Sequence, residues 1–116
     1  MASTLKNTKD YNYYRIMCLI NDDQLLTYRK ISKSILVSTG SAFNLMTDLI
    51  KNGFVNVETL DQNKIRPRYV YSLSSVGVRQ KAILAKFFLN IKQAELEALQ
   101  KELITLKADV GYVSED

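Results

Sequence analysis

The sequence contains no histidine and only one cysteine among its 116 residues. Zinc sites are built mainly from His and Cys side chains, and Ser–His or Cys–His catalysis needs an imidazole base. The carboxylates are scattered along the chain, and no glycine-rich phosphate loop lies near them. We therefore expect no enzymatic activity, no metal site and no cofactor.

A single cysteine also excludes an intramolecular disulfide, which fits a reducing, cytoplasmic environment. Cys18 lies within an apolar helical pattern, so we interpret it as a small buried hydrophobic residue. No apolar run approaches the roughly 18 residues that a membrane span needs. The first ten residues, MASTLKNTKD, lack the apolar core of a signal peptide. We expect a cytoplasmic protein with no membrane partner.

The residues that are present have an ordinary balance, with 47% hydrophobic and 24% charged. The length suits one domain with an extension. The net charge of +4 is unevenly placed, because residues 1–73 carry ten Lys or Arg and six Asp or Glu, whereas residues 74–116 carry six of each. This asymmetry is expected if the first part faces a polyanion, although a mildly basic solvated surface has the same charge count.

Residues 27–53 predict two short helices joined by a tight apolar turn. Thr27 and Ser38 are N-cap residues, each followed by a helical pattern. Gly53 is placed to end the second helix. The second helix has a polar outer face and one apolar stripe, formed by Ala42, Leu45, Met46, Leu49 and Ile50. A capped helix, a turn and a second capped helix are typical of a helix-turn-helix.

Leu36 occupies the turn position where such motifs often use glycine, because one residue there takes a positive φ. A left-handed leucine costs about 1 kcal/mol or more. We therefore expect the turn to be built differently here.

The flanking segments complete the predicted domain. Asp10 is a plausible N-cap for a first helix from Tyr11 to about Asn21, after a flexible stretch at residues 1–9. After Gly53 the period changes to that of strands, with runs at 54–59 and 68–73. Two strands that directly follow a helix-turn-helix predict a wing. The inward stripe of the first helix is expected to be Tyr13, Ile16, Met17 and Ile20.

A long final helix is predicted over residues 75–110, capped by Ser74 or Ser75 and followed by a polar tail at 111–116. Apolar residues recur every seven positions from Leu89 onward, which is a coiled-coil pattern. A parallel dimer would set Glu102 against the partner's Lys107, so we expect parallel helices. A helix that folds back on its own domain is the alternative. The expected dimer interface is Phe87, Phe88, Leu89, Lys92, Leu96, Leu99, Leu103, Leu106 and Val110.

The predicted fold class is α+β, mostly α. It is a winged helix-turn-helix with three helices and a two-stranded wing, followed by a long C-terminal dimerisation helix. The predicted organisation is a flexible N-terminus at 1–9, a DNA-binding domain at 10–74, the long helix at 75–110 and the tail at 111–116.

Five segments resemble motifs of the MarR-type winged-helix transcriptional regulators, most closely the subgroup associated with exopolysaccharide loci. They are TYRKI at 27–31, STG at 38–40, LIKNG at 49–53, YVYSLSSVG at 69–77 and KQAELEAL at 92–99. The chain departs from the subgroup in having Phe43 where Asn is usual, and in having Leu36 in the turn. The resemblance implies a dimeric bacterial DNA-binding regulator of surface-polysaccharide genes. It also implies a small-molecule effector pocket where the long helices meet the winged domains.

We expect this protein to bind double-stranded DNA as a homodimer. The second helix of the pair would read bases in the major groove through Ser38, Thr39, Gly40, Ser41, Phe43 and Asn44. Backbone phosphates would be contacted by Thr27, Arg29, Lys30, Lys33, Lys51, Lys64, Arg66 and Arg68, the last three from the wing. No Lys or Arg lies in residues 38–44, so A·T-rich sites or shape readout are favoured over guanine readout.

Other interpretations stay open from the sequence. Phe43 borders the apolar stripe, so it is equally consistent with a core position. Hairpin tips are commonly polar, so the wing basics also have an ordinary explanation. Winged helices also serve as docking domains, and a protein-interaction module assembled through its coiled coil is the alternative function. A continuous positive strip would favour DNA, whereas a patchy field with exposed apolar residues would favour protein.

Overall fold

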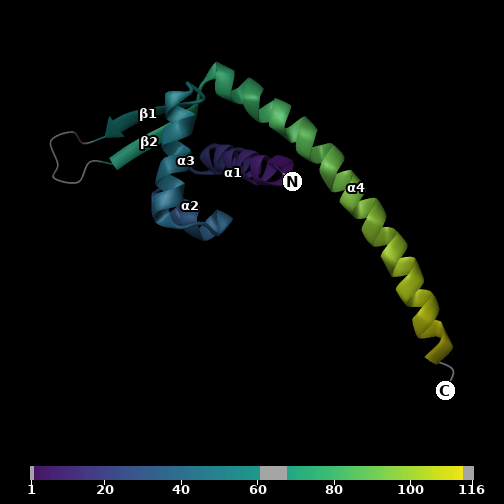
Figure 1. The fold of residues 1–116 in the computed structure, drawn as a ribbon. Helices are drawn as coiled ribbons and strands as arrows, with labels where there is room; N and C mark the ends of the chain where they lie inside the picture. The colour runs from purple at the N-terminus through teal and green to yellow at the C-terminus, as the bar shows by residue number, and fades with distance from the viewer. Residues whose placement is uncertain (1, 61–67, 114–116) are drawn as a thin grey trace. The chain divides into compact units, whose positions relative to one another are not determined.

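A computed structural model describes the backbone of residues 2–60 and 68–113, and the side chains of residues 8–60 and 68–113. The elements follow in the order α1 (Ala2–Asp22), α2 (Tyr28–Ile35), α3 (Thr39–Lys51), β1 (Val55–Leu60), β2 (Arg68–Leu73) and α4 (Ser75–Val113) (Figure 1). Four helices and one antiparallel pair of strands in the described part confirm the predicted winged-helix fold. The chain divides into two compact units, Met1–Ala85 and Lys86–Asp116.

Helix α1 begins at Ala2, so the prediction of a helix start at Tyr11 was wrong. The flexibility expected of residues 1–9 stays a prediction. Asp10 lies inside the helix and is not an N-cap. No Gly or Pro interrupts residues 2–9, so the backbone can continue the helix toward the N-terminus. Lys9 also forms an ion pair of 3.9 Å with Asp48 of α3, which ties this part of α1 to the domain.

The inward face of α1 matches its prediction at Ile16, Met17 and Ile20, which are almost fully buried. Tyr13 and Cys18 are only half-buried, so Cys18 is not the fully enclosed hydrophobic residue that we expected. Their intermediate exposure follows from their places at the margins of the buried stripe.

Both predicted N-caps of the helix-turn-helix are present. The Thr27 hydroxyl accepts a hydrogen bond of 3.1 Å from the Lys30 backbone N–H, and the Ser38 hydroxyl accepts one of 3.0 Å from the Ser41 N–H. Each bond satisfies a donor that has no partner inside its helix. The two caps therefore define the starts of α2 and α3.

Leu36 has φ 57° and ψ 51°, so the left-handed turn is retained and the expectation of a different turn was wrong. The Leu36 and Val37 N–H groups both bond to the Ser32 carbonyl, and the Ser32 hydroxyl donates to the Val37 carbonyl. These bonds offset the strain of a left-handed leucine. The Leu36 side chain is 87% exposed, so the turn brings it out of the core.

Helix α3 buries Ala42, Leu45, Met46 and Leu49, as its apolar stripe predicts. After its last residue, Lys51, and the cap Asn52, Gly53 takes a φ of 80°, and the Phe54 N–H bonds to the Leu49 carbonyl at 3.0 Å. This arrangement is a Schellman ending, in which glycine takes the left-handed position without strain.

The wing pairs Val55 with Leu73 and Leu60 with Arg68 at its two ends. Strand β2 has a second backbone contact, because the Tyr71 N–H donates to the Gln24 carbonyl at 3.0 Å. Gln24 lies in the connection between α1 and α2. This bond ties the base of the wing to the start of the helix-turn-helix, an arrangement that the sequence analysis missed.

Helix α4 is capped by Ser74, whose hydroxyl accepts from the Gly77 N–H at 2.9 Å. The helix runs to Val113, so the predicted polar tail at 111–116 starts too early, and Gly111 is helical. One glycine near a helix end costs about 1 kcal/mol, which is too little to stop a long helix. No helix within residues 2–60 and 68–113 is long and apolar enough to cross a membrane.

Candidate nucleic-acid interface

The N-terminal half of α3 presents a continuous uncharged surface. All six residues predicted to read bases are exposed, namely Ser38, Thr39, Gly40, Ser41, Phe43 and Asn44. The Ser38 hydroxyl also donates to the Ser41 hydroxyl at 3.1 Å, so these two side chains are partly engaged with each other. The structure therefore places the predicted reading residues together, at the start of the second helix of the helix-turn-helix.

One side of this surface is bordered by α1. Ser41, Asn44 and Asp48 line a shallow cavity of about 300 Å³ together with Thr8, Lys9 and Asn12 of α1 and with Val37 and Leu45. The Tyr13 hydroxyl donates to the Asp48 carboxylate at 2.8 Å. Burial and this bond to an anion raise the pKa of Tyr13 to about 12. These contacts hold α3 against α1, and Asn44 is one of the residues that line the cavity between them.

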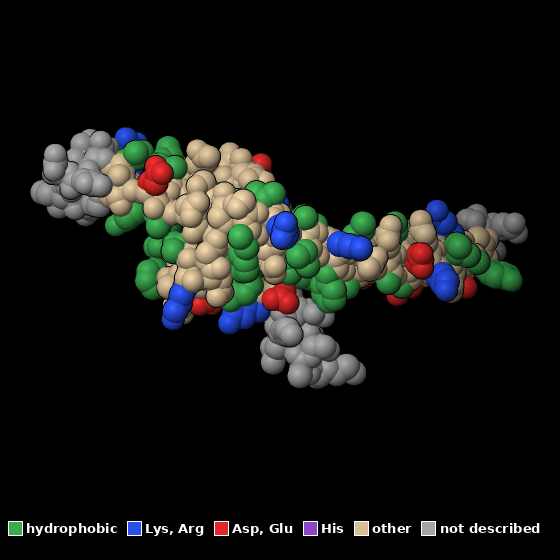
Figure 2. Space-filling model, turned by 90° about the horizontal axis from the view of Figure 1, so that it is seen from above, with side chains coloured by type: hydrophobic (Ala, Val, Ile, Leu, Met, Phe, Trp, Pro, Cys, Tyr) green, Lys and Arg blue, Asp and Glu red, His purple; other side chains and the backbone are tan. Residues whose placement is uncertain are grey.

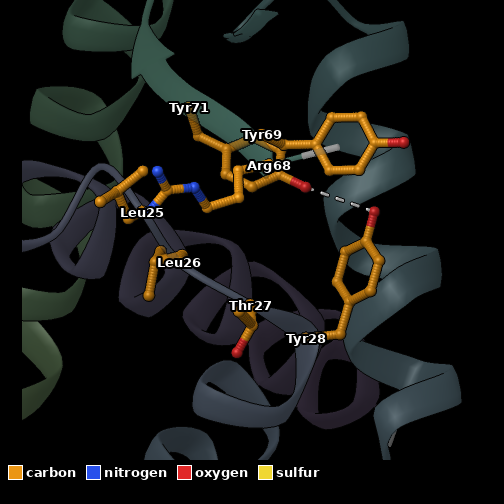
Figure 3. Close-up of a pocket in the computed structure, with 7 residues that line it drawn as sticks. All are labelled: Leu25, Leu26, Thr27, Tyr28, Arg68, Tyr69 and Tyr71. Carbon is orange, nitrogen blue, oxygen red and sulfur yellow. Dashed lines mark hydrogen bonds between the residues drawn. The ribbon is translucent and has the colours of Figure 1, made fainter. Parts of the chain in front are cut away.

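The other side of α3 carries Phe43, which packs edge-on against Tyr28 of α2 with ring centroids 5.3 Å apart. Phe43 is 49% exposed, so it is not a core residue. Tyr28 is held in turn by Tyr71 of β2, whose hydroxyl donates to the Tyr28 hydroxyl at 3.5 Å (Figure 3). Burial raises the pKa of Tyr71 above its ordinary value, so this hydroxyl stays a donor.

The predicted phosphate-binding residues lie in different environments. Arg29, Lys33 and Lys51 are exposed on α2 and α3. Lys30 forms a 3.0 Å ion pair with Asp23, which lowers the pKa of that carboxyl, so its ammonium is engaged with the α1–α2 connection. Lys64 and Arg66 lie outside the described residues. Thr27 uses its hydroxyl as the cap of α2.

Arg68 lies at the start of β2, and its side chain extends over a cavity of about 300 Å³ toward the α1–α2 connection (Figure 3). The other lining residues are Leu25, Leu26, Thr27, Tyr28, Tyr69 and Tyr71. This wall is largely apolar and aromatic, which is typical of small-molecule sites. The sequence analysis gave the Leu25–Leu26 pair no role, because their proximity to β2 depends on the tertiary fold.

Helix α4 carries the predicted dimer interface. Leu89, Leu96, Leu99, Leu103, Leu106 and Val110 are between 44% and 63% exposed in the single chain. Phe88 is only 6% exposed, so it offers little surface to a partner, whereas Phe87 is 45% exposed and contacts it edge-on. Lys92, the one polar position of the repeat, pairs with Glu95 at 3.3 Å.

Charge is not concentrated on the face drawn in Figure 2. Lys and Arg side chains there lie mostly singly among uncharged ones, and hydrophobic side chains are visible between them. Among the described residues that this face shows, the Lys and Arg side chains form no continuous positive strip. Within the described residues, no three His, Cys, Asp or Glu side chains are grouped as they are around a metal ion.

No protein-family model and no curated protein matches the chain. Among solved structures, the adhesin competence repressor AdcR from Streptococcus pyogenes aligns with a TM-score of 0.61 and 17% identity, over 78% of this chain and 65% of that chain. A Staphylococcus aureus MepR mutant bound to an oligodeoxyribonucleotide aligns with a TM-score of 0.55 and 18% identity, over 88% and 75%. S. aureus MarR in complex with salicylate and kanamycin aligns with a TM-score of 0.54 and 19% identity, over 87% and 70%.

This chain therefore spans just under two thirds of AdcR and about three quarters of the MepR mutant. Each of these alignments covers more than three quarters of this chain. Identity is below 20% in all three, so the likeness concerns the arrangement of the elements. On this likeness, the chain shares the winged-helix fold of these structures.

Proposed function

We propose that this protein is a transcriptional regulator that binds a specific double-stranded DNA sequence as a homodimer. The observation that supports it best is the exposed, capped N-terminal half of α3, which is the second helix of a helix-turn-helix. In such motifs this helix enters the major groove with its first residues at the base edges. The related MepR structure with an oligodeoxyribonucleotide supports the same use of the fold.

In this proposal the contacts divide between bases and phosphates. Asn44 pairs with adenine in the major groove, because its amide can both donate and accept. Phosphates are neutralised by Arg29, Lys33 and Lys51, and by the wing residues predicted from sequence, Lys64, Arg66 and Arg68. Lys30 contributes less than the sequence suggested, because its ammonium already pairs with Asp23.

We propose that two copies associate through parallel α4 helices. The exposed leucines recur every seven residues, which forms one narrow apolar seam along each helix. Cross-pairing of Glu102 with Lys107 favours the parallel arrangement, although an exposed ion pair contributes less than about 1 kcal/mol. The seam must therefore supply most of the association energy. Two-fold symmetry would then present two copies of α3 to two half-sites.

The test of DNA binding is selection of bound duplexes from a random pool, followed by measurement of affinity against salt on the selected duplex. We expect a duplex that binds at least about a thousandfold more tightly than competitor DNA, with affinity falling steeply as salt rises. Absence of any preferred duplex at low salt would contradict sequence-specific DNA binding.

The wing is tested separately by a double variant, Arg66→Ala with Arg68→Ala. Each lost phosphate contact should reduce the slope of log affinity against log salt by about 0.9, so the double variant should lose about 1.8. A matched control is Arg79→Ala with Lys81→Ala on α4, which removes the same charge from a helix to which the proposal assigns no DNA contact. An equal change in both double variants would show a nonspecific charge effect, and the wing assignment would be wrong.

The regulated genes follow only from the sequence resemblance, which points to surface-polysaccharide loci in a bacterium. Sequencing of DNA crosslinked to the protein in cells tests this part. Enrichment of promoters upstream of polysaccharide genes is expected, and enrichment confined to other promoters would contradict it.

A protein-docking module is the second candidate, supported by the many exposed apolar residues of α4 and by the scattered charge in Figure 2. The homodimer explains the same apolar residues through their seven-residue spacing, so DNA binding is the function that we prefer. The duplex selection distinguishes the two, because a docking module should enrich no sequence.

We also propose that a small apolar effector binds in the cavity of Figure 3. This site differs from the one that the sequence resemblance implies, where the long helices meet the winged domains. Tyr28 forms part of its wall and contacts Phe43 of α3, so an occupant that moves Tyr28 would alter the DNA surface. Leu25→Trp should fill the cavity. A ligand that weakens DNA binding by wild type but not by this variant supports the site, and equal sensitivity of both proteins contradicts it.

A further inference from the structure

Gly40 is a glycine that the fold does not require. It lies in the first turn of α3, has no positive φ, and a Cβ added to it would meet only the Ser38 hydroxyl, at 3.9 Å. Gly77 is the contrast, since a Cβ there would lie 1.9 Å from the Phe54 carbonyl oxygen. A glycine in a helix lowers stability. Since no neighbouring atom in the fold requires a glycine at position 40, its presence suggests that a binding partner comes close to the helix backbone there.

Phe43 follows Gly40 by three residues, which places both on the same side of the helix. Helical side chains lean toward the N-terminus, so the Phe43 side chain leans toward the turn that contains Gly40, although none of its atoms lies within 4 Å of a Cβ added at Gly40. Nothing within 4 Å fills the space that a Gly40 side chain would take, apart from the Ser38 hydroxyl. The Phe43 ring and the bare Gly40 backbone therefore lie on one exposed side of the helix with open space between them, and we call this space the Gly40–Phe43 notch.

The Phe43 ring is supported from behind. Its edge-on contact with Tyr28 and the bond from Tyr71 to Tyr28 connect it to a residue that is only 4% exposed. A ring braced in this way loses little rotamer freedom when it binds a partner. Residues 38–44 contain no Lys or Arg, the side chains that most often bind guanine in the major groove.

We propose that the Gly40–Phe43 notch receives the C5-methyl group of a thymine in the DNA site, and so determines sequence preference. The thymine methyl is the apolar group that a natural base pair shows in the major groove. Gly40 lets the base edge approach the helix backbone, and Phe43 provides the apolar wall. This inference rests on the proposed function, and it extends that proposal to a base and to the residues that recognise it.

The test replaces thymine by uracil, one position at a time, in the duplex selected by wild-type protein. Uracil lacks only the methyl group, so every hydrogen-bonding edge of the base pair is kept. Wild type should lose about fourfold in affinity at one thymine of each half-site, which corresponds to one buried methyl. Phe43→Ala should bind thymine and uracil duplexes equally at that position.

Gly40→Ala separates binding from folding. The added methyl fills the notch, so the variant should bind the selected duplex several-fold more weakly and lose the thymine preference. Its melting temperature should equal or exceed that of wild type, because alanine is the better helix residue and meets no close neighbour. A merely structural role for Gly40 would leave affinity and thymine preference unchanged.

Two controls match these variants. Val78→Ala truncates an apolar side chain that is 57% exposed on α4, and Gly111→Ala adds a methyl to a helical glycine with nothing within 4 Å. Both should keep the fourfold thymine preference. If wild type binds its selected duplex with an affinity that no uracil substitution changes, the proposal for the notch is wrong and the proposed function stands. The same holds if Phe43→Ala keeps the thymine preference. A wild-type protein that selects no duplex overturns the proposed function instead.

Discussion

The Gly77→Ala variant probes how the start of α4 is fastened to the end of α3. A Cβ at Gly77 would lie 1.9 Å from the Phe54 carbonyl oxygen, 2.9 Å from its carbonyl carbon and 3.2 Å from its Cα. All three are backbone atoms, so no side-chain rotation relieves the overlap. The helix start must move by at least about 1 Å, since Cβ contacts shorter than 3.0 Å essentially do not occur.

That movement breaks contacts that join the two segments. The Ser74 N–H donates to the Phe54 carbonyl at 3.0 Å, and the Ser74 hydroxyl donates to the Gly53 carbonyl. Forced overpacking costs about 1–3 kcal/mol, and each lost hydrogen bond about 1 kcal/mol. Alanine regains about 1 kcal/mol of helix propensity. The net loss in the free energy of unfolding should be about 2–4 kcal/mol.

Urea unfolding followed by circular dichroism measures this loss, with wild type and variant at equal protein concentration because a dimer makes stability concentration-dependent. The midpoint of thermal unfolding should fall by roughly 10 °C or more. Gly111→Ala is the matched control and should be neutral or slightly stabilising, because its added methyl meets nothing within 4 Å. A Gly77→Ala protein within about 0.5 kcal/mol of wild type would refute the close packing of α4 on Phe54.

Three further predictions follow from the same geometry. Leu36→Gly should raise the free energy of unfolding by about 0.5–1 kcal/mol, because glycine adopts a φ of 57° without strain and the lost side chain is 87% exposed. Leu36→Ala should give no gain in the same urea assay, because alanine keeps the strain. The pKa of Tyr13 is raised to about 12 from an ordinary 10.0, so the folded state favours the neutral phenol. The contribution of this group to the free energy of unfolding should therefore be complete below pH 10 and fall between pH 10 and 12. Tyr13→Phe, which cannot ionise, should lose less stability over that interval. Leu103→Glu puts a charge into the apolar seam and should give a monomer by light scattering, while Ile104→Glu, one residue off the seam and 69% exposed, should stay dimeric; a dimeric Leu103→Glu protein would move the interface elsewhere.

The parts that were predictable from the sequence are those that local chemistry decides. Thr27 and Ser38 cap their helices because a hydroxyl near an unpaired backbone N–H needs no distant partner. The buried stripe of α3 follows from helical periodicity, and Gly53 takes the left-handed position because glycine alone adopts it freely. The expectation for α1 failed because residues 2–9 carry no strong local signal for helix or coil.

The candidate site divides in the same way. The exposed reading residues at 38–44 were predictable, because a capped helix with one apolar stripe must turn its other face outward. The bracing of Phe43 by Tyr28 and the cavity beside Arg68 were not, since they join α2, α3 and β2 across long stretches of chain.

By itself, the sequence determined the order of the helices and strands, the caps of α2 and α3, and the seven-residue seam of α4, because each depends on spacing within one segment. The tertiary structure alone decided that Lys30 pairs with Asp23, that β2 bonds to Gln24, and that Gly77 must lack a side chain where it meets Phe54. These features depend on which segments meet in space. The left-handed conformation of Leu36 was also decided by the tertiary structure. Leucine disfavours this conformation by about 1 kcal/mol, and the packing of the two helices and the bonds at Ser32 outweigh that cost.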